Sequence, residues 1–279
     1  GQGPAARHLS PKPRDFRVGI LKFASVASGK LPHDADYDRI IRRGLKGTAM
    51  PAFPFIPESE RRAIVKYLRT FVTAKSKKGP GAIVSIPSDP YLAKPDKGVR
   101  EGERLYHGLA ACSSCHPGYV DKPTIVKHMA SFDIKFSSFR DNMYRSELKD
   151  SDWGVKIKPP DFLVDRIKTG TDKNYIVRAV AAGIGGTAMP NWAATLDRRQ
   201  LWALAYYVEH VAALRGTPEG RALRAKLDGQ GEFKPPPPPP APPPPPEPAL
   251  SASSSASAAP SSSAAAPPKK GPAKQGKKP

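Results

Sequence analysis

The feature that most constrains this chain is a five-residue segment that occurs twice. Residues 47–51 and residues 186–190 both read Gly-Thr-Ala-Met-Pro. An Asp-Phe pair also repeats upstream of each copy, at residues 15–16 and 161–162. The positions before each copy agree as well: Arg39 and Gly44 before the first, Arg178 and Gly183 before the second. Repetition of this kind indicates an internal duplication, so one type of fold must occur twice.

Apolar residues recur at helical spacing in both copies. The i, i+3, i+4, i+7 pattern is followed by Ile64, Tyr67, Leu68 and Phe71 and again by Leu201, Leu204, Ala205 and Val208. Pro57 precedes the first of these helices, and Thr195 is the expected N-cap of the second. Shorter helices are expected over 34–43 and 172–182, each ended by a glycine, and another over 99–109. The sequence therefore predicts an all-α fold.

The chain has two cysteines, Cys112 and Cys115, and the next residue is His116. This C-x-x-C-H spacing is typical of covalent haem attachment, because two thiols one turn apart can each bond a vinyl group while the adjacent imidazole reaches the iron. A structural disulfide, a thioredoxin-like pair and a zinc site are the alternatives. Zinc needs two further ligands, and neither a third cysteine nor an H-x(3-5)-H pair is present. The thioredoxin motif follows a strand in a βαβ pattern, which is not visible. The motif predicts one haem c.

A six-coordinate haem iron needs a second axial ligand besides His116, and Met189 is the best candidate. It lies in a turn-rich segment between two helical patterns, where a stiff loop can direct a side chain instead of packing it as core. The same loop recurs around Met50. His128 and Met143 are weaker candidates that could replace Met189 in an altered state.

The order of elements from residue 97 to 215 resembles class I cytochrome c. The shared features are a helix, C-x-x-C-H, a proline loop, a short helix, Gly-Thr-x-Met-Pro and a terminal helix. The resemblance implies that Gly102 and Tyr106 meet the helix that bears Trp202, Leu204 and Tyr207. It also implies that a proline-loop carbonyl, here of Pro159 or Pro160, holds the haem-binding imidazole. The expected haem contacts are Cys112, Cys115, His116, Met189, Pro160 and Trp192, and Trp192 is equally well explained as plain core.

Residues 1–75 resemble the same module with its beginning missing, and residues 76–96 are the expected linker. We expect a first haem motif just upstream of Gly1, so that the parent resembles a dihaem cytochrome c with a second haem and Met50 facing its iron. A degenerate module that has lost its haem is the alternative. Residues 216–279 are rich in Pro, Ala, Ser and Lys, a composition that predicts a disordered tail.

The formal charge of +20 favours acidic protein partners, such as an oxidase, a reductase or a dehydrogenase. No motif for nucleic-acid recognition is present. No run of 18 apolar residues exists, so no transmembrane segment is expected. The basic tail is suited to contact with an anionic cell envelope.

A haem iron bound by both His116 and Met189 has no open position for a substrate, which favours electron transfer over catalysis. We therefore expect an electron carrier and not an enzyme. The alternatives are a dihaem redox enzyme of peroxidase-like or thiosulfate-oxidising type, with an exchangeable ligand, and a haem-bearing surface adaptor. Because the family attaches its haem after export, a periplasmic or otherwise exported location is expected.

Overall fold

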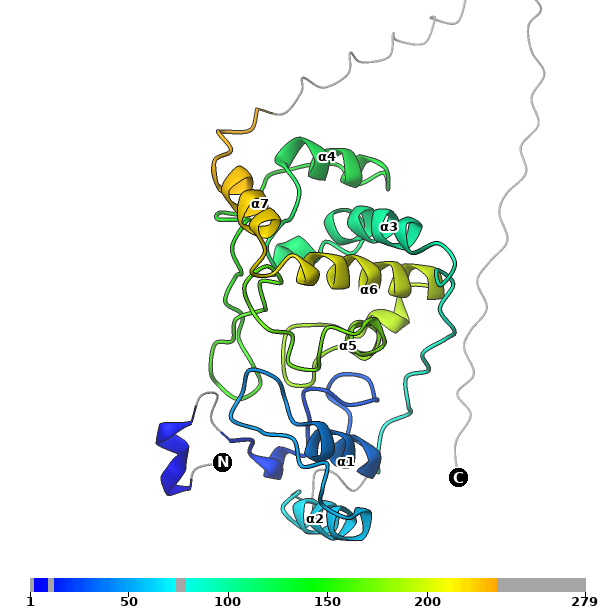
Figure 1. Ribbon diagram of the computed structural model, residues 1–279, viewed down its shortest axis with the longest axis vertical. Helices are drawn as coiled ribbons and strands as arrows, with labels where there is room; N and C mark the ends of the chain where they lie inside the picture. The colour runs from blue at the N-terminus through cyan, green and yellow to red at the C-terminus, as the bar shows by residue number, and fades with distance from the viewer. Residues whose placement is uncertain (1–2, 10–12, 74–78, 235–279) are drawn as a thin grey trace, which may run out of the picture. The chain divides into compact units, whose positions relative to one another are not determined.

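The computed structural model describes residues 3–9, 13–73 and 79–234, so the expected tail from 235 to 279 lies outside the described residues. Its α-helices are α1 (Asp34–Arg43), α2 (Glu58–Thr70), α3 (Pro95–His107), α4 (Lys122–Ala130), α5 (Lys173–Ala182), α6 (Arg198–Ala213) and α7 (Pro218–Asp228) (Figure 1). One-turn 3-10 helices are η1 (Pro4–His8), η2 (Phe16–Val18), η4 (Cys112–Ser114) and η5 (Trp192–Ala194). Among the described residues, strand-type pairing is limited to isolated bridges. The all-α fold class is confirmed.

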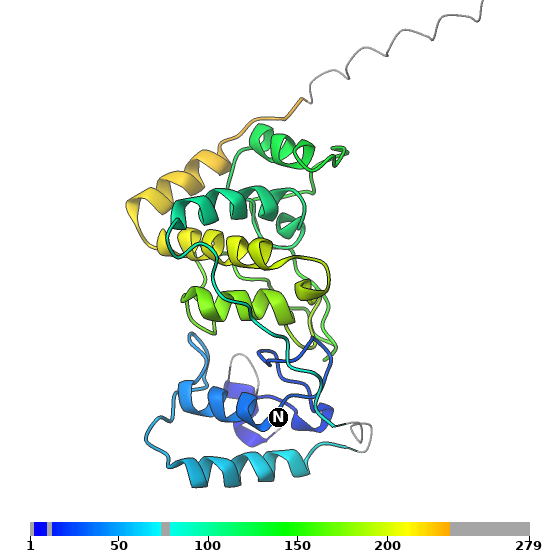
Figure 2. The same ribbon diagram turned by 90° about the vertical axis from the view of Figure 1, so that its right-hand side faces the viewer.

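The second module is built on the crossing of α3 and α6, which lie side by side in Figures 1 and 2. A Cβ atom placed on Gly102 would lie 2.0 Å from the carbonyl oxygen of Ala203, so only glycine permits this approach. One turn further along α3, the ring of Tyr106 packs 5.4 Å from that of Tyr207. The expected contact of the first and last helices is therefore confirmed.

Helix α6 begins at Arg198, two residues later than expected. The N-cap is Asp197 and not Thr195. The carboxylate of Asp197 accepts a hydrogen bond from the backbone N–H of Gln200, and the amide oxygen of Gln200 accepts one from the N–H of Asp197, both at 2.9 Å. This reciprocal pair satisfies two backbone donors at the helix start, which one threonine cannot do.

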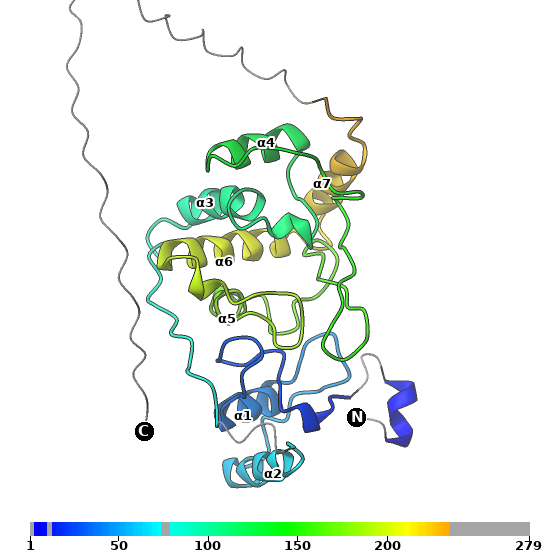
Figure 3. The ribbon, with the colours of Figure 1, turned by 180° about the vertical axis from the view of Figure 1, so that it is seen from behind.

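The segment from residue 216 onward was expected to be disordered, and the structure contradicts this for its first part. Helix α7 occupies Pro218–Asp228, starts at the N-cap Thr217 and buries Leu227 to 2% exposure. Leu227 packs in a cluster with Ile125, Met143 and Tyr144 from the long segment after the cysteines. Figure 3 shows α7 and α4 at the same end of the second module. Long-range packing stabilises α7, and the adjoining proline-rich composition concealed it.

The expected linker contacts both modules. The N–H of Val84 donates to the carbonyl of Ser25 at 2.7 Å, and Trp202 donates its indole N–H to the carbonyl of Pro87 at 2.8 Å. Helix α3 begins at Pro95, inside the expected linker range. The described part of this segment, from residue 79, is thus held along the two modules by hydrogen bonds.

In the first module, α1 and α2 pack around a small core of Leu21, Ala24, Val26, Tyr37, Ile41 and Val65. The outer face of α2 is exposed, with Ile64 at 37% and Tyr67 at 64%. The matching residues of α6, Leu204 and Tyr207, are 1% and 2% exposed because α3 covers them. Among the described residues, no helix covers α2 in the way that α3 covers α6.

The two modules, which belong to one compact unit, contact each other through matched segments. The N–H of Lys46 donates to the carbonyl of Lys168 at 2.9 Å, and the N–H of Gly185 donates to the carbonyl of Lys22 at 3.0 Å. Each donor lies directly before a copy of Gly-Thr-Ala-Met-Pro, and each acceptor lies seven residues after the aspartate of an Asp-Phe pair. The two hydrogen bonds are therefore equivalent, and the modules meet about a pseudo-two-fold axis.

Among the described helices, none is long and apolar enough to span a membrane.

Gly102→Ala should destabilise the fold by about 3 kcal/mol, because a methyl group at this position forces α3 away from the backbone of α6. The control is Gly231→Ala, since no atom lies within 4 Å of the position of its added Cβ. Chemical denaturation measures both variants. Equal stability of the two would contradict the close approach.

Candidate functional site

The two cysteines and the histidine come from one tight turn that follows α3. Ala111 adopts a left-handed conformation with φ of 44°, and η4 then begins at Cys112. The backbone N–H groups of Cys115 and His116 both donate to the carbonyl of Cys112, at 3.2 and 3.0 Å. The two cysteines form no disulfide and are partly buried, and burial raises the pKa of the Cys112 thiol to about 12. The turn thus presents two thiols and an imidazole from a single short segment.

The imidazole of His116 is held in a fixed orientation. Its Nδ1–H donates to the carbonyl of Pro160, with 2.9 Å between the atoms, so the proline-loop hydrogen bond is present. Its ring stacks on Phe162 at 5.1 Å and 18°. Burial lowers the pKa of His116, which keeps the ring neutral near pH 7. A neutral ring that donates through Nδ1 leaves the Nε2 lone pair available for a metal.

Met189 lies in a loop that is braced by its own hydrogen bonds. The Thr187 hydroxyl donates to the carbonyl of Ile184 at 2.7 Å and accepts from the N–H of Met189 at 3.2 Å. Gly183 has a φ of 75°, and a Cβ there would lie 2.7 Å from the carbonyl oxygen of Pro190. This bracing directs the Met189 side chain without placing it on a helix.

The loop around Met50 has the same construction. Thr48 donates to the carbonyl of Leu45 at 2.8 Å and accepts from the N–H of Met50 at 3.1 Å. Met50 packs on the core of the first module. Cys112, Met189 and Trp192 instead pack on the core of the second module, to which Phe162 also belongs. Three of the predicted site residues of the second module thus pack on one core, while Met50 packs on the other.

The donor set fits a haem better than a lone metal ion. Among the described residues, no group of three His, Cys, Asp or Glu side chains could hold one metal ion together. In a zinc site the two thiols and the imidazole would have to point at a single atom. In haem c the sulfurs bond the edge of the porphyrin while the imidazole binds the iron, so convergence is not required. The chemistry of Cys112, Cys115, His116 and Met189 fits this group.

Arg140 is a residue of this site that the sequence did not reveal. Its guanidinium donates to the carbonyls of Ser113 and His116, both at 2.9 Å, and to that of Met143 at 3.1 Å. Arg140 lies in the long segment that follows the turn of residues 111–116, here called the attachment turn, and holds the backbone of that turn in place. One arginine in a segment rich in charge carries no local signal for such a role.

The alternative ligands named from the sequence are engaged elsewhere. The Nε2 atom of His128 lies 3.1 Å from a carboxylate oxygen of Glu103. Met143 is 6% exposed in the cluster that includes Leu227. His107, which was not named as a ligand from the sequence, is also buried and accepts a hydrogen bond through Nε2 from the N–H of Tyr119 at 3.1 Å.

Arg140→Gln should lower the free energy of unfolding by about 2 kcal/mol, because several partly buried carbonyls lose a charged donor. It should also reduce the haem content per chain, as the attachment turn loosens. Lys135→Gln removes one exposed positive charge from the same segment and serves as the control. Denaturation and haem quantitation would contradict this role if both variants behaved alike.

His107 should make the fold sensitive to acid. Burial lowers its pKa from 6.5 to about 3, so only the unfolded chain takes up the proton between these values. The stabilising contribution is complete above pH 6.5 and falls by about 1.4 kcal/mol per unit as the pH drops toward 3. His107→Gln should have a flatter stability profile from pH 7 to 4 than the exposed control His210→Gln. Parallel profiles in denaturant titrations would refute this assignment.

Comparisons with known proteins agree with this geometry. The family described as cytochrome C oxidase, cbb3-type, subunit III, matches residues 97–208. A chain of the reducing HAO-like protein complex of Kuenenia stuttgartiensis is similar with a TM-score of 0.59 and 27% identity, over 77% of this chain and 86% of that chain. A comparison with curated protein sequences finds no match. The family match and the helical crossing together show that residues 97–208 belong to the class I c-type cytochrome-like domains.

Proposed function

We propose that this protein carries single electrons through a haem c attached to Cys112 and Cys115. His116 and Met189 are the residues that would bind its iron. The observation that supports this most strongly is the hydrogen bond from His116 Nδ1–H to Pro160, because it leaves Nε2 free to bind iron in a fixed direction. The haem supplies reversible one-electron chemistry at its iron, and methionine ligation raises its potential.

The protein contributes the orientation of the side chains that would bind the haem. Phe162 stacks on the His116 ring, and Arg140 fixes the carbonyls on both sides of Cys115. The hydrogen bonds of Thr187 hold the loop of Met189. Small movement of these groups between two charge states favours electron transfer, and two protein ligands leave no position for a substrate. An electron carrier is therefore favoured over a dihaem redox enzyme.

The first module is proposed to hold a second haem, with Met50 as a ligand. Three observations support this. The Met50 loop has the same hydrogen bonds as the Met189 loop, the two modules meet about a pseudo-two-fold axis, and α2 exposes the face that α6 buries under α3. A helix that leads into a second attachment motif is the element that fits this apolar face.

The proposed partners are acidic redox proteins. The formal charge of +20 attracts an acidic surface and accelerates encounter more than it raises affinity. The solved relative is described as part of a reducing HAO-like protein complex, which supports a redox protein as the partner. An exported location is proposed because haem c attachment in this family follows export.

Met189→Ala should change the visible spectrum and lower the reduction potential of the haem, since axial ligands set haem potentials over a range of about 0.8 V. Met129→Ala removes a methionine that packs against the cluster of Ile125 and Leu227 and is the control. The control should keep the spectrum of the unmodified protein. A Met189→Ala protein with an unchanged spectrum and potential would overturn the axial assignment.

A further inference from the structure

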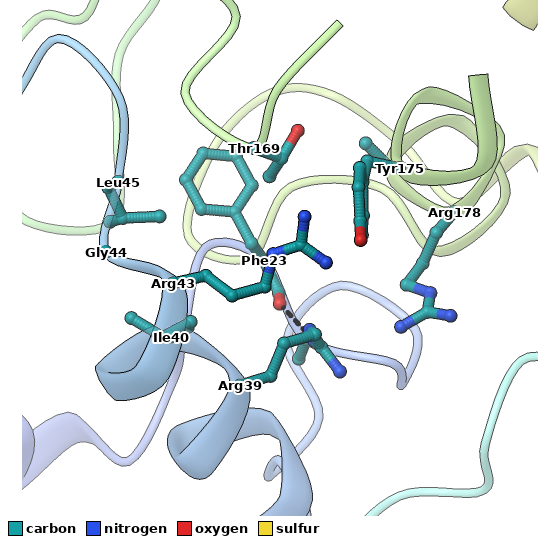
Figure 4. A pocket seen from close by; sticks show the side chains of 11 residues that line it. Phe23, Arg39, Ile40, Arg43, Gly44, Leu45, Thr169, Tyr175 and Arg178 are labelled. Carbon is teal, nitrogen blue, oxygen red and sulfur yellow. Dashed lines mark hydrogen bonds between the residues drawn. The ribbon is translucent and has the colours of Figure 1, made fainter. Parts of the chain in front are cut away.

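A pocket opens where the two modules meet, and three arginines line it (Figure 4). Arg39 and Arg43 come from α1, and Arg178 comes from α5. The rings of Phe23 and Tyr175 also belong to its lining. Its volume is about 40 Å³, which is room for one compact group and not for an extended ligand.

The pocket lies at the pseudo-two-fold axis. Arg39 and Arg178 are 139 positions apart, as are the two loop methionines, so they are equivalent residues of the two modules. Phe23 and Thr169 are equivalent by their distance from the two Asp-Phe pairs. Because equivalent residues line the pocket from both sides, like charges from the two modules meet there.

The positive charge of the pocket is only partly offset. Arg39 pairs with Asp36 at 2.7 Å, and the same carboxylate also accepts from the backbone N–H groups of Ser25 and His33. The guanidinium of Arg43 lies 4.0 Å from the centre of the Tyr175 ring.

The guanidinium of Arg178 has neither an ion pair nor a hydrogen bond within the described ranges 3–9, 13–73 and 79–234. Burial and the neighbouring Arg39 and Arg43 lower the pKa of Arg178, while the carboxylate of Asp36 acts in the opposite direction. Among the residues that the structure describes, these three guanidinium groups thus have one neighbouring carboxylate, that of Asp36, and the half-buried guanidinium of Arg178 has no hydrogen-bond or ion-pair partner.

We propose that this pocket binds a small inorganic oxyanion, with phosphate as the probe, and that the bound anion holds the two modules together. Guanidinium groups present planar sets of N–H donors that match the oxygens of an oxyanion. A tetrahedral anion offers oxygens in several directions, which suits donors that arrive from α1 and α5. Its charge offsets the repulsion between Arg39, Arg43 and Arg178. The site does not depend on the electron-transfer function.

The test measures thermal unfolding of the haem-loaded protein in phosphate and in chloride at equal ionic strength, together with phosphate affinity by calorimetry. Phosphate should raise Tm in a saturable manner, as expected for a ligand of the folded state. Arg178→Gln should weaken phosphate binding about tenfold, the loss expected for one charged hydrogen bond. Arg43→Gln removes an exposed side chain and gives a second loss variant if Arg178→Gln folds poorly.

Arg42→Gln is the matched control, since it removes the same charge from the exposed face of the same helix. It should bind phosphate as the unmodified protein does. Equal phosphate responses in Arg42→Gln and Arg43→Gln would overturn the proposal, as would no saturable response in the haem-loaded protein. Tighter binding of acetate than of phosphate would also overturn it and would assign the pocket to a carboxylate group.

Discussion

The close approach of α3 to α6 at Gly102 is the contact on which the second module depends. It brings two helices together without an intervening side chain, so Tyr106 and Tyr207 can pack one turn away. Helix α3 ends just before the attachment turn, and its position therefore sets where the thiols and His116 begin. The orientation of the imidazole then follows from the carbonyl of Pro160 and the ring of Phe162. Helix packing thus sets the position of the site, and the contacts with Pro160 and Phe162 set the orientation of the His116 ring.

Much of the fold could be predicted from the sequence because its signals are local. Helix α1 was expected over 34–43 and occupies that range, since periodicity and a terminal glycine lie within one window. The C-x-x-C-H motif at residues 112–116 could be recognised from the sequence because its chemistry requires residues that are close together along the chain. Helix α7, the Asp197 cap and the role of Arg140 were missed. The packing of α7 depends on residues about a hundred positions away, and the hydrogen bonds of Arg140 depend on carbonyls some twenty-five positions away. A local sequence pattern cannot show contacts of this kind.

The duplication explains how the modules meet. A surface that has been copied can bind its own copy when each half offers a donor and an acceptor, as Lys46 with Lys168 and Gly185 with Lys22 do. The same arrangement places Arg39 opposite Arg178, which is electrostatically unfavourable unless a negative group lies between them. The association of the two modules and the concentration of positive charge between them thus both follow from the duplication.

Each methionine loop also joins the two modules, because the residue before its first glycine donates a backbone hydrogen bond to the other module. Any rearrangement that withdraws Met189 from its position pulls on the backbone at Gly185 and hence on Lys22. The two modules are therefore linked through the loops that carry Met50 and Met189. Displacement of either loop strains the contact between the modules, and a firm contact resists that displacement.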